Sequence, residues 1–297
     1  MKTICVPVGC RSDAGLSAPI IKRLRESGWC EVQVVQLEPQ EFIPSYQIAE
    51  YYCRGEPHIG NHNHKKPDLL FITGDRVEQC AAANAAFLNQ IPIAHYYGGI
   101  INLPITTYDD VFRHTITMLS NIQFVESNEA AGVVWDLKHA VGLKSNIHVV
   151  GISHLDDMAL DESLVPKTKY TLILYNPPTT ISNDIYDIYS QSCIYNDYTI
   201  LIGSNPDGKT NAYLEEMVDI YYPNLPRAQF LGLLKNCHRF ISNSSCCIYE
   251  APHFLNPEQI IMIGDRNKNR PRGPFKTGAS DKIVTILKEY LCGENQK

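Results

Sequence analysis

Short apolar runs rich in β-branched residues alternate with amphipathic stretches along most of this chain of 297 residues. The alternation is typical of repeated βαβ units, in which parallel strands form a sheet and helices cover its faces. In the first half we expect helices at 17–27, 77–88, 109–119 and 128–137, and strands at 3–8, 32–36, 69–73, 91–94, 122–125 and 147–150. In the second half we expect a closing helix at 281–291 and strands at 170–175, 198–202, 239–241 and 259–263.

A polar stretch at 151–169 separates the two series of elements. Compact domains usually contain roughly 100–150 residues, so a chain of this length is expected to form two. The sequence therefore predicts an α/β protein with an N-terminal Rossmann-like domain at 1–155 and a C-terminal one at 156–297. We expect the two domains to face each other across a cleft that holds the site.

Composition and charge exclude several classes of protein. The formal net charge is −6, and no basic stripe suited to a nucleic-acid backbone is visible. No apolar run approaches the roughly 20 residues of a membrane span. The ten cysteines contain no CxxC pair and the N-terminus resembles a first strand, so we expect a reduced, cytoplasmic protein. His58, His62 and His64 fit a solvated loop better than a metal site, and we expect neither a metal nor a cofactor.

The first candidate motif is the glycine-containing turn after the first expected strand. It runs from Val8 to Leu16 and includes Gly9 and Arg11. Backbone N–H groups and a helix N-terminus at such a turn suit an anion, and Arg11 adds a positive charge. The alternative is an ordinary βα turn with a solvated arginine.

The second candidate motif follows the strands expected at 69–73 and 91–94. Asp75 comes two residues after the first of these strands, behind Gly74, and His95 lies at the end of the second. Asp109 and Arg113 stand four residues apart at the start of a helical pattern, so both should project from one face. This set suits proton abstraction beside a bound phosphate. The alternative is a helix-start acid with its salt-bridge partner.

The third candidate motif joins a strand to a helix at 241–252. Ser244 and Ser245 provide hydroxyl groups that suit a diphosphate, and Glu250, expected in the first turn of the helix, can accept two ribose hydroxyls. The alternative is a serine N-cap followed by an acidic first turn.

Taken together, these motifs resemble the UDP-N-acetylglucosamine 2-epimerases, most closely the branch that hydrolyses its substrate. The resemblance covers most of the chain and is most specific from 67 to 125. It is carried by Gly9-Cys10-Arg11-Ser12-Asp13-Ala14-Gly15-Leu16, Gly74-Asp75-Arg76-x-Glu78, His95-x-x-Gly98-Gly99, Asp109-x-x-x-Arg113-His114, Asn205-Pro206-Asp207-Gly208, Asn243-Ser244-Ser245 with Glu250-Ala251-Pro252, and Ile263-Gly264-Asp265-Arg266.

This resemblance implies the glycosyltransferase-B fold of two Rossmann-like domains and a UDP-sugar as substrate. The implied reaction removes the proton at sugar C2, eliminates UDP to give a glycal, and inverts C2 on readdition. Asp75 would be an acid/base group, with Asp109 as the second carboxylate and Arg113 as its partner. The resemblance also implies a homodimer, and a set of substrate- or UDP-binding residues: Gly9, Arg11, His95, Asn176, Ser244, Ser245 and Glu250.

The chain departs from the family pattern at several positions. Tyr97 stands where the family usually has a catalytic Glu, Ile100 where it often has a second Glu, and Asn176 where it has a His. A tyrosine, whose ordinary pKa is about 10, cannot simply replace a carboxylate base. Three hypotheses remain: a 2-epimerase with an altered sugar or step, a glycosyltransferase on the same scaffold, and a silent nucleotide-sugar binding protein.

Overall fold

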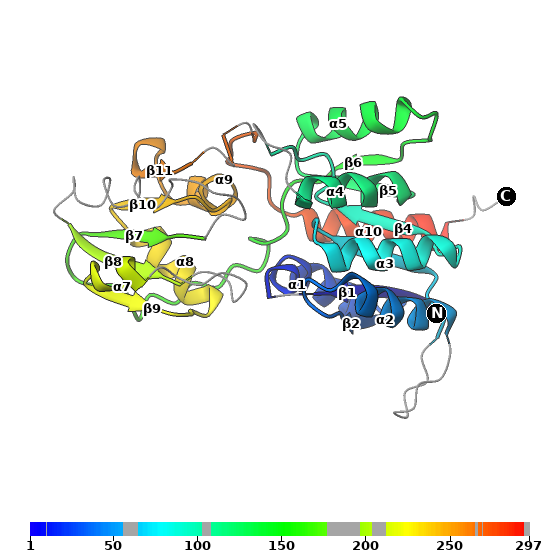
Figure 1. Ribbon diagram of the computed structural model, residues 1–297, viewed down its shortest axis with the longest axis horizontal. Coiled ribbons are helices and arrows are strands. Elements are labelled where there is room, and N and C mark those ends of the chain that lie inside the picture. The colour runs from blue at the N-terminus through cyan, green and yellow to red at the C-terminus, as the bar shows by residue number, and fades with distance from the viewer. Residues whose placement is uncertain are drawn as a thin grey trace. The chain divides into compact units, whose positions relative to one another are not determined.

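The computed structural model of the protein describes residues 1–9, 11–55, 65–102, 108–176, 197–203, 212–264, 267–268 and 270–293, without the side chains of 11, 12, 212 and 213. The chain forms two compact units (Figure 1). The first unit contains 1–101, 106–157 and 275–297, and the second contains 102–105 and 158–274. Each unit is built on a parallel sheet, as the alternating sequence pattern predicts.

The sheet of the first unit contains six strands within the described ranges, in the order β2-β1-β3-β4-β5-β6. All neighbouring strands run parallel. β3, β4 and β5 are buried along their whole length, because the strands of a parallel sheet are covered on both faces. The strands are β1 (Lys2–Val8), β2 (Cys30–Gln36), β3 (Leu69–Thr73), β4 (Ile93–Tyr96), β5 (Ile122–Val125) and β6 (Ile147–Val149).

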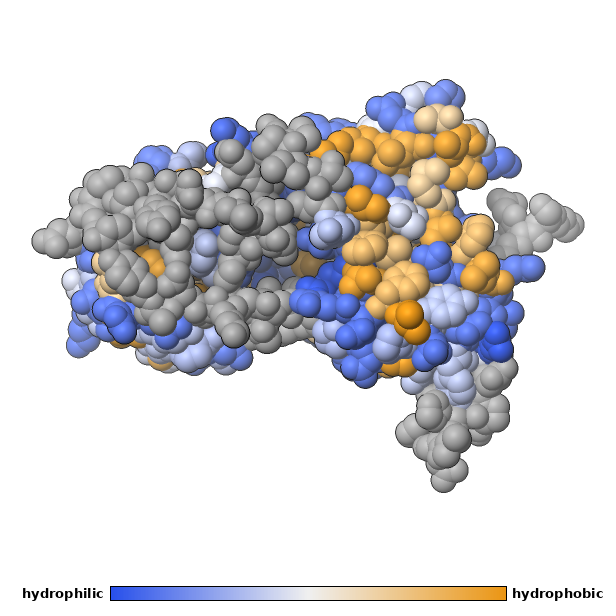
Figure 2. Space-filling model, viewed as in Figure 1, coloured by the Kyte–Doolittle hydropathy of each residue, from blue (hydrophilic) through white to orange (hydrophobic). Residues whose placement is uncertain are grey.

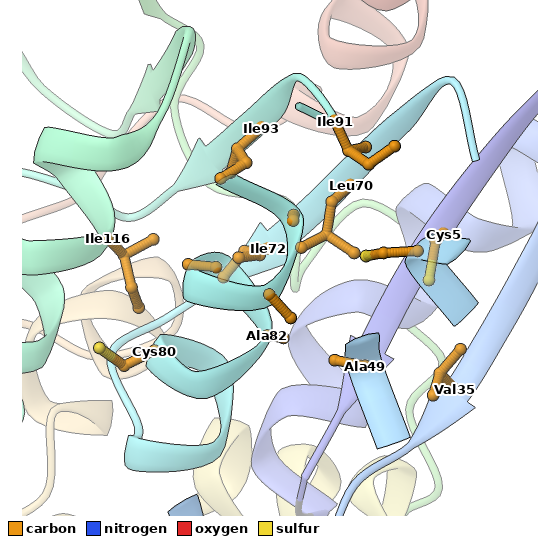
Figure 3. Close-up of a cluster of buried hydrophobic side chains, with 14 of the residues drawn as sticks. Cys5, Val35, Ala49, Leu70, Ile72, Cys80, Ala82, Ile91, Ile93 and Ile116 are labelled. Carbon is orange, nitrogen blue, oxygen red and sulfur yellow. The ribbon is translucent and has the colours of Figure 1, made fainter. Parts of the chain in front are cut away.

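The described helices of the first unit are α1 (Arg11–Glu26), α2 (Phe42–Arg54), α3 (Val77–Leu88), α4 (Tyr108–Leu119), α5 (Asn128–His139) and α10 (Ala279–Cys292). α2 packs on α3, and α3 packs on α4. Five of the eight buried residues of α3 are alanines, so its backbone can approach the sheet closely. Figure 3 shows the resulting core, in which Leu70 and Ile72 of β3 meet Ala82 of α3 and Ala49 of α2. None of the described helices is long and apolar enough to cross a membrane.

The second unit has its own parallel sheet, in the order β11-β10-β7-β8-β9 among the described strands. Ile173, Leu201 and Ile241 form the centre of its core. The strands are β7 (Tyr170–Leu174), β8 (Tyr198–Ile202), β9 (Ile220–Tyr222), β10 (Arg239–Ser242) and β11 (Ile260–Met262). The described helices are α7 (Ala212–Glu216), α8 (Arg227–Asn236) and α9 (Cys246–Tyr249), with short 3-10 turns at Ala251–His253 and Pro257–Gln259.

Each sheet has one point at which its strand order reverses. In the first sheet the reversal lies between β1 and β3, and in the second between β7 and β10. Open α/β sheets bind ligands outside the carboxyl ends of the strands at such a point. Two places in the molecule therefore qualify on topology: the loops at 9 and 74–76 in the first unit, and those at 176 and 243–245 in the second.

The sequence predicted the buried strands better than the helices. β3, β5, β8 and α3 have the predicted bounds, and the other predicted strands are confirmed with shifted ends. α1 begins at Arg11 instead of residue 17, because the turn after β1 is short and Asp13 accepts a hydrogen bond from the Gly9 N–H in the first turn of the helix. The elements α2, α7, α8 and β9 were not predicted.

The C-terminal helix corrects the predicted domain division. The sequence analysis placed all of 156–297 in the second domain, whereas α10 packs against α1 in the first unit. Packing in the first unit buries five side chains of α10: Ala279, Ser280, Ile283, Leu287 and Leu291.

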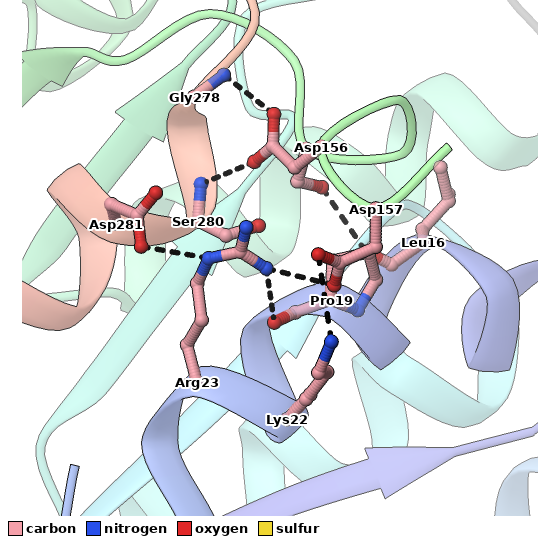
Figure 4. A network of polar contacts seen from close by, with 10 residues as sticks. Leu16, Pro19, Lys22, Arg23, Asp156, Asp157, Gly278, Ser280 and Asp281 are labelled. Atoms are coloured by element: carbon pink, nitrogen blue, oxygen red, sulfur yellow. Dashed lines mark hydrogen bonds and ion pairs between the residues drawn. The ribbon is translucent and has the colours of Figure 1, made fainter. Parts of the chain in front are cut away.

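Polar contacts fix the start of α10 to the segment at 156–157 (Figure 4). The Asp156 carboxylate accepts the backbone N–H groups of Gly278 and Ser280, at 2.5 and 2.8 Å. Arg23 of α1 pairs through Nε with Asp281, at 2.7 Å, and through Nη1 with Asp157, at 2.8 Å. Asp156 thus satisfies backbone donors that the first turn of a helix leaves without partners.

Replacing Asp156 with Ala should destabilise the first unit. We expect the free energy of unfolding to fall by roughly 1.5–3 kcal/mol, because two hydrogen bonds to a charged group are lost. Asp281→Ala is the matched control: the Asp281 side chain is 72% exposed, and an exposed ion pair contributes about 0–1 kcal/mol. Both tryptophans, Trp29 and Trp135, lie in the first unit, so urea denaturation followed by their fluorescence measures the change. Equal losses in the two variants would contradict the capping role.

Candidate functional site

Asp75 lies just beyond the carboxyl end of β3. Gly74 precedes it with a φ of 91°, a backbone conformation that favours glycine, and donates its N–H to the carbonyl of Tyr96, at 3.0 Å. The Asp75 carboxylate pairs with Nη2 of Arg113. The Asp75 side chain is 28% exposed, whereas that of Arg113 is 2% exposed. The Asp75 carboxylate is therefore partly exposed at the surface of the first unit, and its cationic partner is buried.

Three groups of the first unit hold the Arg113 guanidinium. In addition to the pair with Asp75, Nη1 donates to the carboxylate of Asp110, at 2.7 Å, and to the carbonyl of Ile100, at 2.8 Å. Asp110 and Arg113 stand three residues apart on α4 and share its buried face. The sequence analysis named Asp109 as the partner of Arg113. That pairing remains a prediction, and the buried Asp110 was missed.

His95 is a buried link between β3, β4 and α4. With Nε2 protonated, the imidazole donates to the carbonyl of Gly74, at 2.8 Å, and Nδ1 accepts from the Thr117 hydroxyl, at 3.2 Å. Burial lowers the pKa of His95 to about 4, so the imidazole is neutral at physiological pH. These contacts fix the turn that carries Asp75. The predicted contact of His95 with substrate remains a prediction.

Tyr97, where the sequence analysis expects a departure from the family pattern, follows β4 in a fixed conformation. Its φ is 70°, which is uncommon for a residue other than glycine. The ring stacks on Tyr96 with centroids 3.9 Å apart, and the hydroxyl lies 2.9 Å from Nδ1 of His154. Tyr97 and His154 are each only 5% exposed. His154 was missed because it lies in the stretch that the sequence analysis assigned to a linker.

The turn after β1 is pressed against the start of α3. A side chain at Gly9 would place its Cβ 2.2 Å from Cγ of Glu78, so a larger residue there would have to displace the Glu78 side chain. Glu78 is buried and pairs with Nε of Arg76, at 2.6 Å. Gly9 therefore lies at the reversal point of the first sheet, close to the loop of Asp75. The side chain of Arg11 lies outside the described part of the chain.

At the reversal point of the second sheet, Asn176 and Asn243 are joined by two hydrogen bonds. The Asn176 N–H donates to Oδ1 of Asn243, at 2.9 Å, and Nδ2 of Asn243 donates to the carbonyl of Asn176, at 2.7 Å. Ser244 follows directly, and its N–H donates to Oγ of Ser242, at 2.9 Å. Ser245 is the N-cap of α9. The predicted residues Asn176, Ser244 and Ser245 therefore meet at one edge of this sheet.

Glu250 is placed differently from the prediction. It was expected in the first turn of a helix, but α9 is a single turn and Glu250 follows it as the C-cap. Pro252, which lacks a backbone N–H, is the second residue of the 3-10 turn that comes next and so limits the helix. The Glu250 side chain is 10% exposed and accepts from Nη2 of Arg227 on α8, at 3.3 Å.

Several predicted features lie outside the described residues. They are the three histidines His58, His62 and His64, the loop Asn205-Pro206-Asp207-Gly208, and the pair Asp265-Arg266. Within the described ranges, no group of three or more His, Cys, Asp or Glu side chains could hold a metal ion.

Comparison with known proteins identifies sequence relatives. The sequence model of the family described as UDP-N-acetylglucosamine 2-epimerase matches residues 60–292. The UDP-N-acetylglucosamine 2-epimerase of Neisseria meningitidis is 30% identical over 70% of the chain and 58% of its own length. A hydrolysing UDP-N,N'-diacetylbacillosamine 2-epimerase of Legionella pneumophila is 27% identical over 98% of the chain and 89% of its own. The chain thus spans somewhat more than half of the Neisseria protein.

Solved structures share the fold. The Staphylococcus aureus MnaA–UDP complex has a TM-score of 0.79 at 20% identity and covers 100% of this chain and 99% of its own. The N. meningitidis UDP-GlcNAc 2-epimerase bound to UDP-GlcNAc has a TM-score of 0.70 at 16% identity, over 98% and 93% of the two chains. These likenesses confirm the predicted glycosyltransferase-B-like α/β fold.

The buried His95 should make stability depend on pH. Its folded pKa, about 4, lies below the ordinary value of 6.5, so the imidazole is neutral in both states above pH 6.5. As the pH falls from 6.5 to 4, only the unfolded state gains this proton, and stability is lost. We expect wild type to lose roughly 2 kcal/mol between pH 7 and pH 5 through this group.

The comparison with His95→Gln isolates that contribution. Glutamine can still donate to the Gly74 carbonyl but does not titrate, and the other histidines are the same in both proteins. Urea denaturation at pH 7 and at pH 5 should therefore show a smaller pH dependence in the variant. An identical pH dependence in the two proteins would show that His95 is not buried in its neutral form.

Proposed function

The chain belongs to the UDP-N-acetylglucosamine 2-epimerase family, and we propose that it acts on a UDP-sugar by eliminating UDP and inverting C2. Hydrolytic release of the free sugar is the favoured outcome, because hydrolysing 2-epimerases are among its relatives. The observation that carries the proposal is the buried Arg113, which presents the carboxylate of Asp75 at the carboxyl edge of the first sheet. No cofactor is required for this reaction.

The proposed roles follow from the chemistry of the reaction. The reaction moves protons at sugar C2, so it needs acid/base groups beside the sugar, and we assign Asp75, whose carboxylate pairs with the buried Arg113, as one of them. Asp109 is the second carboxylate of the set. We assign the diphosphate and ribose to Gly9, Arg11, Ser244, Ser245 and Glu250, and include His95 and Asn176 among the substrate-binding positions.

The second unit supports UDP binding independently of the catalytic residues. Asn176, Ser244 and Ser245 lie at the reversal point of its sheet, where open α/β sheets bind ligands. Glu250 is already oriented by Arg227, whose side chain is 41% exposed. A carboxylate held in this way can accept two neighbouring hydroxyls of a ribose.

We also propose a homodimer and a cytoplasmic setting. Apolar side chains gather over α3, α4 and α5 on the face in Figure 2, and the exposed ones on or directly after these helices include Phe87, Leu88, Val111, Trp135 and Val141. A patch of this kind is typical of a protein interface. Sedimentation of the purified chain measures the assembly.

Burial raises the pKa of the Cys80 thiol to about 11, in keeping with unreactive thiols in a reducing compartment.

Incubation with a panel of UDP-sugars in D2O, followed by NMR, tests the proposed reaction. We expect UDP release and a free sugar with inverted C2 that carries deuterium at that carbon. Asp75→Asn keeps the shape of the side chain and removes its basicity, so turnover should fall by about 10²–10⁴-fold. A sugar transferred to an acceptor would favour the glycosyltransferase hypothesis, and UDP binding without turnover of any substrate would favour the silent binding protein.

Glu250→Ala should weaken UDP binding by roughly 1.5–3 kcal/mol, because hydrogen bonds to a charged group are lost. Isothermal titration calorimetry with UDP measures the change. Glu258→Ala, which removes an exposed carboxylate from the same unit, is the matched control and should bind UDP as wild type does. Unchanged UDP affinity in a folded Glu250→Ala protein would remove the assignment of Glu250 to the ribose.

A further inference from the structure

We propose that Tyr97 and His154 form a proton-transfer pair that acts on the sugar in place of a carboxylate at the end of β4. The inference rests on the proposed function. It starts from the short contact between the Tyr97 hydroxyl and Nδ1 of His154, at 2.9 Å, with both residues only 5% exposed. Tyr97 is the catalytic member and His154 the positioning member, which accepts the phenol proton.

The position of Tyr97 places it among the reactive groups of the sheet. Tyr96 of β4 pairs with Thr73 of β3, so Tyr97 and Asp75 lie just beyond the carboxyl ends of neighbouring strands. The next strand, β5, is followed by Glu126, which is 4% exposed. Reactive groups of parallel α/β sheets gather at this edge. Asp75 and Tyr97 therefore follow adjacent strands at the same edge of the sheet.

The backbone at Tyr97 is held in a conformation that few side chains adopt. A φ of 70° costs conformational energy for any residue with a Cβ, and such residues cluster at functional sites. The stack on the Tyr96 ring and the hydrogen bond to His154 help to maintain it. On the other side, Gly99 is confined, because a Cβ there would lie 2.1 Å from the carbonyl of Ala130. The turn therefore presents the phenol in one orientation.

The pairing changes what the phenol can do. An isolated tyrosine, with an ordinary pKa near 10, is a poor base at neutral pH. A phenol that donates to Nδ1 can pass its hydroxyl proton to the imidazole while the phenol oxygen accepts a second proton from the substrate. An ordinary histidine is mostly neutral at pH 7, so its imidazole can accept the hydroxyl proton. The same arrangement activates hydroxyl groups next to histidine in other enzymes.

The proposed step balances as follows. The C2 proton moves to Oη of Tyr97 while the phenol proton moves to Nδ1 of His154, giving an imidazolium. The electron pair of the C2–H bond becomes the C1=C2 double bond, and the C1–O bond breaks with its electron pair leaving on UDP. Water then supplies the hydroxyl at C1 and a proton to the opposite face of C2, and the imidazolium returns its proton to solvent.

Four variants of the full chain test the pair on the UDP-sugar that wild type turns over. Tyr97→Phe removes the hydroxyl, and His154→Gln keeps a hydrogen-bond acceptor that cannot take a proton. Tyr97→Glu supplies a carboxylate in place of the phenol. Tyr170→Phe is the matched control, because the buried Tyr170 hydroxyl donates to the Leu233 carbonyl, at 2.6 Å, within the second unit.

We expect Tyr97→Phe and His154→Gln to lower kcat by about 10²–10⁴-fold, with little change in KM or in UDP affinity. The rate at which deuterium is incorporated at C2 should fall in proportion to kcat. Tyr97→Glu should recover at least about tenfold of the loss seen in Tyr97→Phe, and Tyr170→Phe should keep the wild-type kcat. Recovery by a carboxylate distinguishes proton transfer from a packing role.

The outcomes separate the pair from the function on which it rests. If wild type turns over a UDP-sugar and folded Tyr97→Phe or His154→Gln keeps its kcat, the pair is overturned and the proposed function stands. A loss of kcat in Tyr170→Phe as large as that in Tyr97→Phe would also overturn it, since any lost buried hydrogen bond would then suffice. If wild type releases no UDP from any UDP-sugar, both the function and the pair fall.

Discussion

The candidate site of the first unit depends on the buried guanidinium of Arg113. Taking such an ion out of water costs several kcal/mol unless charged partners and hydrogen bonds compensate for it. Here the compensation comes from three segments: Asp75 after β3, Asp110 on α4, and the Ile100 carbonyl in the turn after β4. Because the guanidinium contacts all three segments, it links them to one another. The surface position of Asp75 follows from this balance.

The two sheets solve the same problem with different groups. At each reversal point two loops must approach each other without leaving backbone groups unsatisfied. In the first unit, Gly9 allows Glu78 to approach, and the side chain of Asp13 accepts the Gly9 N–H. In the second unit, the amide of Asn243 bonds both the N–H and the carbonyl of Asn176. Contacts within the chain thereby organise both edges.

The features that could be predicted from the sequence are those encoded by short, continuous stretches of residues. Buried parallel strands are continuous apolar runs bounded by turns, so β3 and β8 could be placed, together with the residues that follow such strands, Asp75 among them. Which of Asp109 and Asp110 faces inward depends on the rotation of α4 about its axis, and an acidic doublet does not specify that. Glu250 was misplaced because the helix before it stops after one turn.

Long-range contacts leave no comparable trace in a single sequence. α10 has a clear amphipathic pattern, but that pattern does not specify which helix covers its apolar face. The helix that does so, α1, lies more than 250 residues earlier in the chain, and the Arg23–Asp281 pair joins residues that are equally far apart. His154 lies in a polar stretch with no periodicity, so nothing marked it as a neighbour of Tyr97. Each of these contacts is made by tertiary packing, which only the folded chain displays.

The pairing of Tyr97 with His154 changes how a substitution at a catalytic position should be interpreted. Judged from the sequence, exchanging a carboxylate for a phenol removes a base, because the two groups differ by several pKa units. Judged from the fold, what the reaction needs at the end of β4 is a proton acceptor in a fixed orientation, and a phenol hydrogen-bonded to an imidazole meets that need. Tyr97 and His154 should therefore be interpreted together, because each makes a hydrogen bond with the other.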